Sequence, residues 1–407
     1  MPKLTLQNLI DKDLIKGKRI LVRTDFNIPL DEQGIISDDK RIMESLPTIQ
    51  AIIKEGGKCI LMSHLGRPKG EKKPEYSLSV VAEYLSNILD KAVLFSDDCI
   101  GDDNISVIEA MKEGDVLLLE NLRFYKEEEK NDSQFAKKLA AYGDIYVNDA
   151  FGTAHRAHAS TEGVTHHIKL SSAGYLMEKE LKFLSEAITD PERPLCAILG
   201  GSKISGKIDV LENLLSLADT ILIGGGMMFT FYKAMGYNIG KSILEEDKLG
   251  LAKEILEKAK NSKAKFILPE DVLMADKIDK DAHAKEMFSD RITTDFNDWS
   301  GVDIGPKTIH KYREEILRSK TIIWNGPMGI FEIDIFATGT MEIAKALAEA
   351  TENGAVSVIG GGDSASAISK AKLEDKVTHV STGGGASLEF LEGKKLPGVE
   401  ALSEADS

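Results

Sequence analysis

Arginines follow short apolar runs in the first half of the chain. Of ten arginines among 407 residues, four stand in such positions: Arg23, Arg67, Arg123 and Arg156. The planar guanidinium fork matches the oxygen atoms of carboxylates and phosphates. A single arginine of this kind would be explained as well by a surface or structural ion pair. Four in corresponding positions predict a pocket for a small anion that carries several charges.

The second half of the chain places glycine where the first half places arginine. Glycine-rich strings follow its apolar runs at 200–203 (GGSK), 224–226 (GGG), 325–327 (NGP), 360–364 (GGGDS) and 383–385 (GGG). Glycine lets the backbone approach a ligand closely, and N–H groups at a helix start suit phosphate. Tight turns need glycine too, but with Lys203 and Lys207 nearby the set favours a nucleotide subsite. Asp363 is then the candidate Mg²⁺ ligand, and a helix N-cap is its alternative role.

Three better-known motifs are incomplete or absent. Residues 201–207 fit G-x4-G-K, but Ile208 stands where a P-loop needs Ser or Thr for Mg²⁺. Neither a dinucleotide-binding G-x-G-x-x-G with its later acidic residue nor a G-x-S-x-G elbow occurs. His155 and His158 lie three residues apart, but no third ligand accompanies them, which disfavours zinc.

Apolar runs rich in Ile, Val and Leu alternate with stretches of helical period. The runs are 19–22, 59–62, 92–95, 116–119, 145–147, 195–199, 220–223, 266–268, 321–324, 355–359 and 377–380. The helical stretches include 79–89, 133–142, 248–260 and 340–351. Runs that are apolar on both faces are typical of parallel strands covered by helices. We therefore predict an α/β protein, in which ligands bind at the carboxyl ends of the strands.

Length and composition narrow the class of protein. At roughly 100–200 residues per domain, the chain is long enough for two domains. Residues 173–188 have helical period and precede Pro191 and Pro194, which predicts an interdomain helix. The net charge of −15 disfavours nucleic acid and membrane surfaces as partners. Three scattered cysteines and the lack of a long apolar run predict a reduced, cytoplasmic protein.

An anion pocket in one domain and a Mg²⁺-nucleotide pocket in the other predict phosphoryl transfer. Such transfer depends on positioning and on neutralising charge more than on covalent catalysis. A carboxylate acceptor would need no catalytic base, because it is already ionised at pH 7.

The chain resembles the phosphoglycerate kinase family along almost its whole length. The strings that carry the resemblance are RTDFNIP (Arg23–Pro29), SHLGRPKG (Ser63–Gly70), LENLRF (Leu119–Phe124), YVNDAFGTAHRAHAST (Tyr146–Thr161), LGGSKISGK (Leu199–Lys207), WNGPMGIFE (Trp324–Glu332), GGGDS (Gly360–Ser364) and STGGGASLEFLEGK (Ser381–Lys394). These strings are far more specific than the short motifs above. They imply reversible phosphoryl transfer from 1,3-bisphosphoglycerate to MgADP, which gives 3-phosphoglycerate and MgATP.

The resemblance also assigns site residues. It implies that the substrate is bound by Asp25, Phe26, Asn27, Arg41, His64, Leu65, Gly66, Arg67, Arg123 and Arg156. It implies that the nucleotide is bound by Gly201, Lys203, Lys207, Gly224, Gly225, Asn325, Pro327, Glu332, Gly360, Gly361, Gly362, Asp363 and Ser364, with Asp363 as metal ligand. Arg41, Lys203, Gly361 and Gly362 would act on the phosphoryl group in transfer. Arg41 follows no predicted strand, and only the pattern D-x-R-I at 39–42 supplies it.

The same resemblance implies two Rossmann-like three-layer domains with parallel sheets, joined by the interdomain helix. The 3-phosphoglycerate-binding domain would span 1–172, the helix 173–190 and the nucleotide-binding domain 191–390, with 391–407 packing back on the first domain. We expect a monomer whose domains close on both substrates and exclude water. Two alternatives stay open: a kinase or ATPase with another acceptor, and a non-catalytic two-domain protein that binds an anion.

Overall fold

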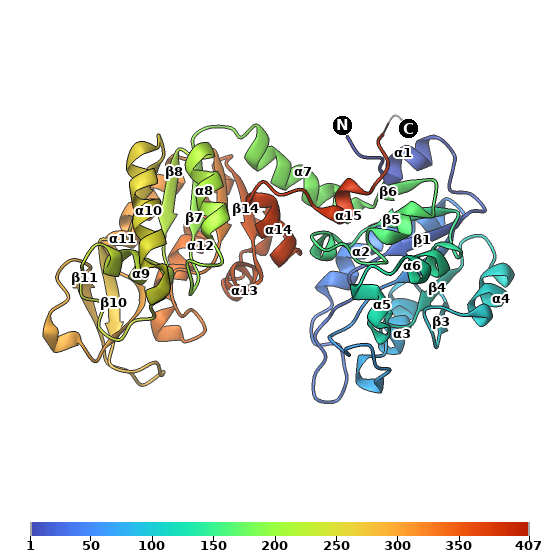
Figure 1. Cartoon of the computed structure of the whole chain (residues 1–407), viewed down its shortest axis with the longest axis horizontal. Helices are drawn as coiled ribbons and strands as arrows, with labels where there is room; N and C mark the ends of the chain where they lie inside the picture. The colour runs from blue at the N-terminus through green and yellow to red at the C-terminus, as the bar shows by residue number, and fades with distance from the viewer. Residues whose placement is uncertain (1, 406–407) are drawn as a thin grey trace. The chain divides into compact units, whose positions relative to one another are not determined.

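The structure, a computed structural model, describes residues 2–405 and contains two compact units (Figure 1). The chain passes from unit 1 to unit 2 between Leu181 and Lys182, inside helix α7 (Tyr175–Thr189). It returns to unit 1 between Lys394 and Lys395. Unit 1 therefore contains both ends of the described chain, and unit 2 is one continuous segment.

Unit 1 is built on a parallel sheet of six strands in the order β3-β4-β2-β1-β5-β6. Its strands are β1 (Arg19–Arg23), β2 (Lys58–Met62), β3 (Val93–Ser96), β4 (Val116–Leu119), β5 (Ile145–Asn148) and β6 (Ser171–Ala173). The central strands are buried almost throughout, because they are apolar on both faces and helices cover them.

The helices of unit 1 are α1 (Leu6–Asp11), α2 (Lys40–Lys54), α3 (Ser79–Ile88), α4 (Asp102–Ala110), α5 (Lys126–Glu129), α6 (Ser133–Ala140), the first part of α7, and α15 (Pro397–Glu400). Leu9 of α1, Ile49 of α2 and Leu85 of α3 join one core cluster with the strands. Helix α15, from the C-terminal segment, packs on the rest of unit 1 through Gly398, whose N–H donates to the carbonyl of Ala154 at 2.8 Å.

Unit 2 contains a second parallel sheet of six strands, in the order β15-β14-β13-β7-β8-β9. Its strands are β7 (Leu195–Leu199), β8 (Thr220–Ile223), β9 (Lys265–Ile267), β13 (Thr321–Asn325), β14 (Val356–Gly360) and β15 (His379–Val380). A separate antiparallel sheet consists of β10 (Asp271–Ala275), β11 (Ala284–Phe288) and β12 (Ser300–Ile304).

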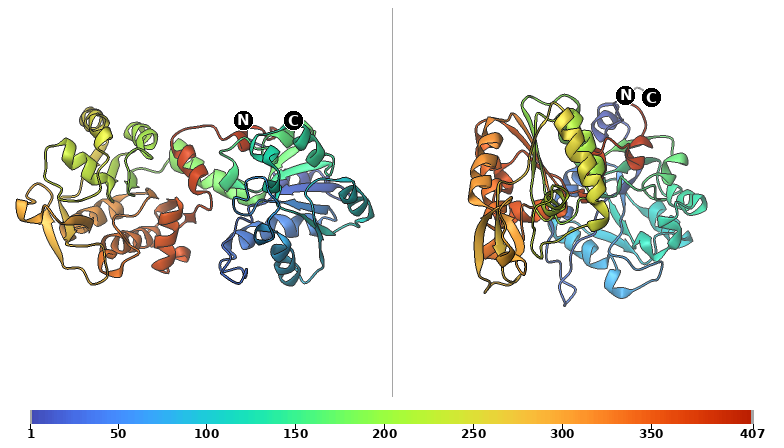
Figure 2. Two further views of the ribbon diagram at one scale, coloured as in Figure 1. Left: turned by 60° about the horizontal axis from the view of Figure 1, so that its bottom comes forward. Right: turned by 60° about the vertical axis from the view of Figure 1, so that its left-hand side comes forward.

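The helices of unit 2 form two groups. They are α8 (Ile208–Leu217), α9 (Met227–Ala234), α10 (Leu249–Asn261), α11 (Pro306–Arg318), α12 (Thr338–Glu352), α13 (Gly362–Lys370) and α14 (Gly384–Leu391). Helix α8 contacts α10 and α14, whereas α12 contacts α11 and α13. The groups flank the sheet as outer layers (Figure 2). No helix within residues 2–405 combines the length and apolar character needed to cross a bilayer.

The predicted α/β class with two parallel sheets is confirmed, and each predicted apolar run contributes a strand. Four strands were not predicted: β6 and the three strands of the antiparallel sheet, β10, β11 and β12. Strand β6 is Ser-Ser-Ala and has no apolar signal, although all three residues are buried. Strand β11 is mostly exposed, so its sequence AKEMF lacks the pattern of a covered strand.

A buried carboxylate fixes the point at which α7 begins. Asp149 follows β5 and is fully buried. Its Oδ1 accepts hydrogen bonds from the N–H groups of Leu176 (2.9 Å) and Met177 (3.3 Å). Thr48 of α2 adds a third bond, accepting the N–H of Tyr175 at 2.9 Å. Burial raises the pKa of Asp149 to about 7, although the hydrogen bonds to Met177 and Leu176 oppose this.

This pKa predicts a pH-dependent stability. Because the ordinary pKa of Asp is about 3.9, the folded protein keeps a proton that the unfolded chain releases between pH ~4 and ~7. The stabilisation is complete at low pH and is lost as the pH rises through about 7. Asp149→Asn cannot ionise at this position. As the pH rises from 5 to 8, we expect its free energy of unfolding to increase relative to that of wild type by on the order of 1 kcal/mol or more. Urea unfolding at both pH values measures this difference.

Asp144→Asn is the matched control. The hydrogen bond from Arg19 lowers the pKa of Asp144, so its titration lies below this pH range and its effect on stability should not change between pH 5 and 8. Parallel pH profiles for wild type and Asp149→Asn would contradict the prediction.

Candidate functional site

The predicted substrate-binding residues of unit 1 include Asp25 and Asn27, in the loop after β1, and Arg41, which contacts this loop from α2. Arg41, the second residue of α2, donates from Nη1 to Oδ2 of Asp25 at 2.8 Å. The other oxygen of Asp25 accepts the N–H of Asn27 at 3.2 Å. The Arg41 side chain remains about one-third exposed. Asp25 therefore fixes the direction of an arginine that is still accessible to a ligand.

Gly66 links three of the predicted residues. Its N–H donates to Oδ1 of Asn27 at 2.8 Å, and its carbonyl accepts Nη1 of Arg123 at 2.9 Å. Its φ is +63°, and a β-carbon there would collide with the ring of Tyr76. Only glycine fits this turn without strain.

The side chain of Arg23 is enclosed by the fold, which corrects the prediction from strand ends that it lines an anion pocket. Its side chain is fully buried, with Nε donating to Oγ of Ser160 at 2.8 Å and Nη2 lying 3.1 Å from Nδ1 of His64. Ser160 in turn donates to the buried carboxylate of Glu128 at 2.6 Å. Burial raises the pKa of Glu128, and the charge of Arg23 opposes that rise. Arg23 therefore supplies a fixed internal charge rather than a ligand contact.

The charges of four arginines act on two buried histidines. Burial, followed by Arg23, Arg123 and Arg41, lowers the pKa of His64 well below its ordinary value. Burial and the charges of Arg23, Arg123 and Arg156 lower the pKa of His158 to about 3. Nδ1 of His158 is buried and, within the described chain, has no hydrogen-bond partner. The sequence had suggested His158 only as a metal ligand, and its nearness to Arg156 was the available signal.

The remaining predicted residues of unit 1 differ in exposure. Arg67 and Arg156 are exposed, and Nε of Arg156 lies 3.2 Å from Nε2 of His155. The side chains of Phe26 and Leu65 are buried in the core cluster. Phe26 and Leu65 can therefore contact a ligand only through their backbone groups.

In unit 2, the loops after β7, β8 and β13 pack backbone against backbone. Gly201 N–H donates to the carbonyl of Pro327 at 3.0 Å, and Gly225 N–H donates to that of Met328 at 2.9 Å. Gly225 has a φ of +66°, and a β-carbon on it would lie 2.5 Å from the nitrogen of Gly201. These glycines are needed for the contact between loops, besides any role toward a ligand.

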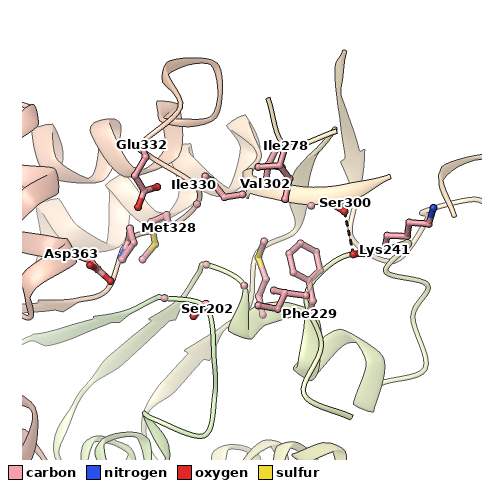
Figure 3. A pocket seen from close by; sticks show the side chains of 18 residues that line it. Ser202, Phe229, Lys241, Ile278, Ser300, Val302, Met328, Ile330, Glu332 and Asp363 are labelled. Atoms are coloured by element: carbon pink, nitrogen blue, oxygen red, sulfur yellow. Dashed lines mark hydrogen bonds between the residues drawn. The ribbon is translucent and has the colours of Figure 1, made fainter. Parts of the chain in front are cut away.

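A pocket of about 460 Å³ opens at these loops (Figure 3). Of the predicted nucleotide residues, Gly201, Gly225, Pro327, Glu332 and Asp363 line it. Its remaining wall is largely apolar and includes Phe229, Ile243, Val302, Met328 and Ile330. This wall could not be predicted from the sequence, because apolar residues that line a pocket have the same pattern as core residues. Figure 3 shows the carboxylates of Glu332 and Asp363 on the side of the pocket away from Phe229.

Polar groups gather at the start of α13. Helix α13 begins at Gly362, and a β-carbon on Gly384, the first residue of α14, would lie 3.5 Å from the nitrogen of Gly362. The two helix starts are thus adjacent, and their free N–H groups favour an anion. Oγ of Ser364 accepts the N–H of Gly326 at 2.6 Å, which ties α13 to the loop after β13.

Two lysines lie in the segment before α8. Nζ of Lys207 contacts Oδ1 of Asn325. Burial lowers the pKa of Lys207 to about 8, and the charges of Asp363 and Glu392 oppose this. Lys203 is exposed and forms no ion pair within residues 2–405.

A ready-made metal site is not present in the described residues, where no three His, Cys, Asp or Glu side chains cluster as ligands. Mg²⁺ in nucleotide sites usually takes one or two carboxylates and completes its shell with phosphate oxygens and water. The exposed carboxylate of Asp363, in the first turn of α13, fits that donor set.

The burial of both histidines predicts that they stay neutral. We expect His158 to take up no proton above pH 5 and His64 to titrate well below the ordinary range of histidine, because burial and the neighbouring arginines disfavour the imidazolium. NMR of protein labelled at histidine, titrated from pH 8 to 5, tests this. In urea the same histidines should titrate near ~6.5, the ordinary value. In the folded protein, a midpoint above pH 5 for His158, or an unshifted midpoint for His64, would contradict the prediction.

Comparisons with known proteins agree over nearly the whole chain. The family model described as phosphoglycerate kinase matches residues 10–394. Phosphoglycerate kinase of Chloroherpeton thalassium is 61% identical over 396 residues, which cover 97% of this chain and 99% of that relative. The Chlorobaculum tepidum relative is 57% identical over 404 residues, covering 99% of this chain and all of that relative.

Solved structures give the same result. That of phosphoglycerate kinase from Coxiella burnetii has a TM-score of 0.88 at 43% identity, and that from Pyrococcus horikoshii OT3 a TM-score of 0.83 at 34% identity. Each covers 98% of this chain and is itself covered to 98%. Together with the arginine-rich loops of unit 1 and the pocket of unit 2, these matches show that the chain belongs to the phosphoglycerate kinase family.

Proposed function

We propose that the protein transfers a phosphoryl group reversibly between 1,3-bisphosphoglycerate and MgADP, giving 3-phosphoglycerate and MgATP. In a member of this family, the observation that carries the proposal is that residues suited to bind an anion lie in one unit and residues suited to bind a nucleotide lie in the other. Accessible arginines around neutral histidines lie in unit 1, and a partly apolar pocket next to two helix starts lies in unit 2. An anion site and a nucleotide site are the two halves that this reaction needs.

In unit 1, the arginines bind the phosphate and carboxylate of the glycerate substrate. Arg41, Arg67, Arg123 and Arg156 supply the positive charge, and their guanidinium forks suit both groups. The histidines His64 and His158 act as neutral hydrogen-bonding groups. Asp25 and Asn27 shape the loop and contact the glycerate hydroxyl, together with backbone groups of Phe26, Leu65 and Gly66.

In unit 2, the apolar wall takes the base of the nucleotide between the turns at Gly201 and Gly224–Gly225. Glu332 binds the ribose, and Asn325 and Pro327 form the adjoining wall. The phosphates lie at the start of α13, where N–H groups of Gly360, Gly361 and Gly362, the hydroxyl of Ser364 and the ammonium of Lys207 neutralise them.

Asp363 would hold Mg²⁺ together with the nucleotide phosphates. The ion, when bound, neutralises negative charge on the phosphate oxygens. A single exposed carboxylate in the first turn of α13 supports this assignment.

The chain's own residues lower the barrier by placing charge around the phosphoryl group in flight. The carboxylate oxygen of 3-phosphoglycerate attacks the terminal phosphorus of ATP, the new acyl phosphate bond forms, and ADP leaves with the electron pair. The carboxylate is ionised at pH 7, so no side chain has to remove a proton. Arg41, Lys203 and the N–H groups of Gly361 and Gly362 stabilise the equatorial oxygens.

The consumption of ATP tests the proposed reaction directly. We expect ATP consumption to require both 3-phosphoglycerate and Mg²⁺, with acyl phosphate formation followed by its coupled reduction. Removing one charge that stabilises the transition state costs about 10²–10³ in turnover number. Arg41→Ala and Lys203→Ala should each show losses of that order. Arg318→Ala and Lys260→Ala, which remove exposed helix-surface charges, serve as matched controls and should be fully active.

Two outcomes of this assay would overturn the function. ATP turnover that does not depend on 3-phosphoglycerate would indicate a kinase or ATPase with another acceptor. Binding of both ligands without any turnover in wild type would indicate a binding protein.

The proposed reaction also predicts closure of the two units around both substrates. Because the two groups of residues belong to separate units, transfer requires the units to approach each other once both substrates are bound. We expect the radius of gyration from small-angle scattering to fall with 3-phosphoglycerate and MgATP analogue together, relative to either ligand alone. An unchanged radius with both ligands would count against closure.

A further inference from the structure

Glu332 lies in the middle of a long loop that is held firmly at its two ends. The loop joins β13 to α12. Near its start, Met328 N–H donates to Oγ1 of Thr340 at 3.0 Å, and Ile330 N–H donates to the carbonyl of Val302 at 2.8 Å. Beyond the loop, Gly339 N–H donates to the buried carboxylate of Asp303 at 2.5 Å. None of these bonds reaches residues 331–335, where Glu332 lies.

The middle of the loop is held by Lys370. Its Nζ donates to the carbonyl oxygen of Phe331 at 2.8 Å and to Oδ1 of Asp334 at 2.7 Å. These two acceptors lie on either side of Glu332 in the sequence. Within residues 2–405, they are the only hydrogen bonds that reach residues 331–335 from another element.

Lys370 also connects this loop to the phosphate end of the site. It is the last residue of α13, the helix whose first turn carries Gly362 and Asp363. At 1.5 Å per residue, a nine-residue helix spans roughly 12 Å and acts as a rigid spacer. Together with the packing of the buried Phe331 and of Ile333, one helix and one ammonium group thus connect Glu332 to the helix start that carries Asp363. Both carboxylates line the same pocket (Figure 3).

The contacts are suited to positioning more than to stability. Asp334 is 90% exposed, and an exposed ion pair contributes little to the free energy of unfolding. The ammonium has three donors and no acceptor, so it can hold a backbone carbonyl and a carboxylate at once. It also lies at the C-terminus of α13, where the helix dipole favours a cation.

We propose that Lys370 is a positioning residue for the nucleotide: it holds the Glu332 carboxylate at a fixed distance from the start of α13 and thereby determines the affinity for the ribose hydroxyls. This inference rests on the ribose role of Glu332 in the proposed function. It predicts that the loss of Lys370 weakens the ribose contact and leaves the base and phosphate contacts in place.

The test compares two nucleotides that differ only in the ribose hydroxyls. Calorimetry gives the dissociation constants for ADP and for 2′,3′-dideoxyadenosine diphosphate in wild type, Lys370→Met, Glu332→Ala and the double variant. We expect Lys370→Met to weaken ADP binding about three- to tenfold, which corresponds to the net value of one hydrogen bond. Binding of the dideoxy nucleotide should change less than twofold, and the double variant should bind ADP as Glu332→Ala does.

Lys345→Met is the matched control. Lys345 is an exposed lysine of α12 in an ion pair with Glu342 at 2.7 Å, and its loss should change neither dissociation constant. Retained binding of the dideoxy nucleotide by Lys370→Met shows that unit 2 of the variant is folded.

Two results would overturn the inference. Equal weakening of both nucleotides in Lys370→Met, or additive losses in the double variant, would show that Lys370 does not act through Glu332. Equal binding of both nucleotides by wild type would instead refute the ribose role of Glu332 itself. Since calorimetry needs no turnover, a failure of the proposed reaction would leave this comparison intact.

Discussion

Contact between backbones at the carboxyl ends of β7, β8 and β13 is the constraint on which unit 2 depends. The loops meet so closely that Gly225 has no space for a side chain beside Gly201. Hydrogen bonds from Gly201 to Pro327 and from Gly225 to Met328 then join the three loops into one layer. The glycine turns on one side of the pocket consequently expose main chain, whose position is set by the strands. Side chains such as Phe229 and Met328 can pack on it as on a core surface.

Unit 1 differs from unit 2, because long charged side chains gather near the carboxyl ends of its strands. Each fixed arginine has an acceptor within the fold: Asp25 for Arg41, the carbonyl of Gly66 for Arg123, and Ser160 for Arg23. An arginine held in this way loses less rotamer freedom when an anion binds. Burial and the neighbouring arginines lower the pKa of both histidines, so the positive field comes from guanidinium groups, which keep their charge at every physiological pH.

Every strand of the parallel sheets except β6 could be predicted, because a strand covered on both faces is apolar along its length. The antiparallel sheet was missed as a whole, including β10, whose Val272 and Met274 are buried. Ser171 and Ser172 are buried in β6 at a sheet edge, and β11 is exposed. In the site, residue types that are rare in cores, such as Arg67 or Asp363, could be identified from sequence. Phe229 could not, because the same residue would serve in a core, and the enclosed position of Arg23 depends on Ser160, 137 positions away. The roles of the site residues stay predictions, since they concern ligands.

The path of the chain has a consequence for how the molecule is made. Unit 1 is completed by residues from both ends: Leu4 N–H donates to the carbonyl of Ser403 at 2.8 Å, and Ser403 N–H donates to that of Ser171 at 2.9 Å. During synthesis from the N-terminus, every residue of unit 2 therefore emerges from the ribosome before unit 1 can form its last bonds. Unit 2 is one uninterrupted segment and can fold as soon as it has emerged. The half of the protein that is begun first is thus the half that is finished last.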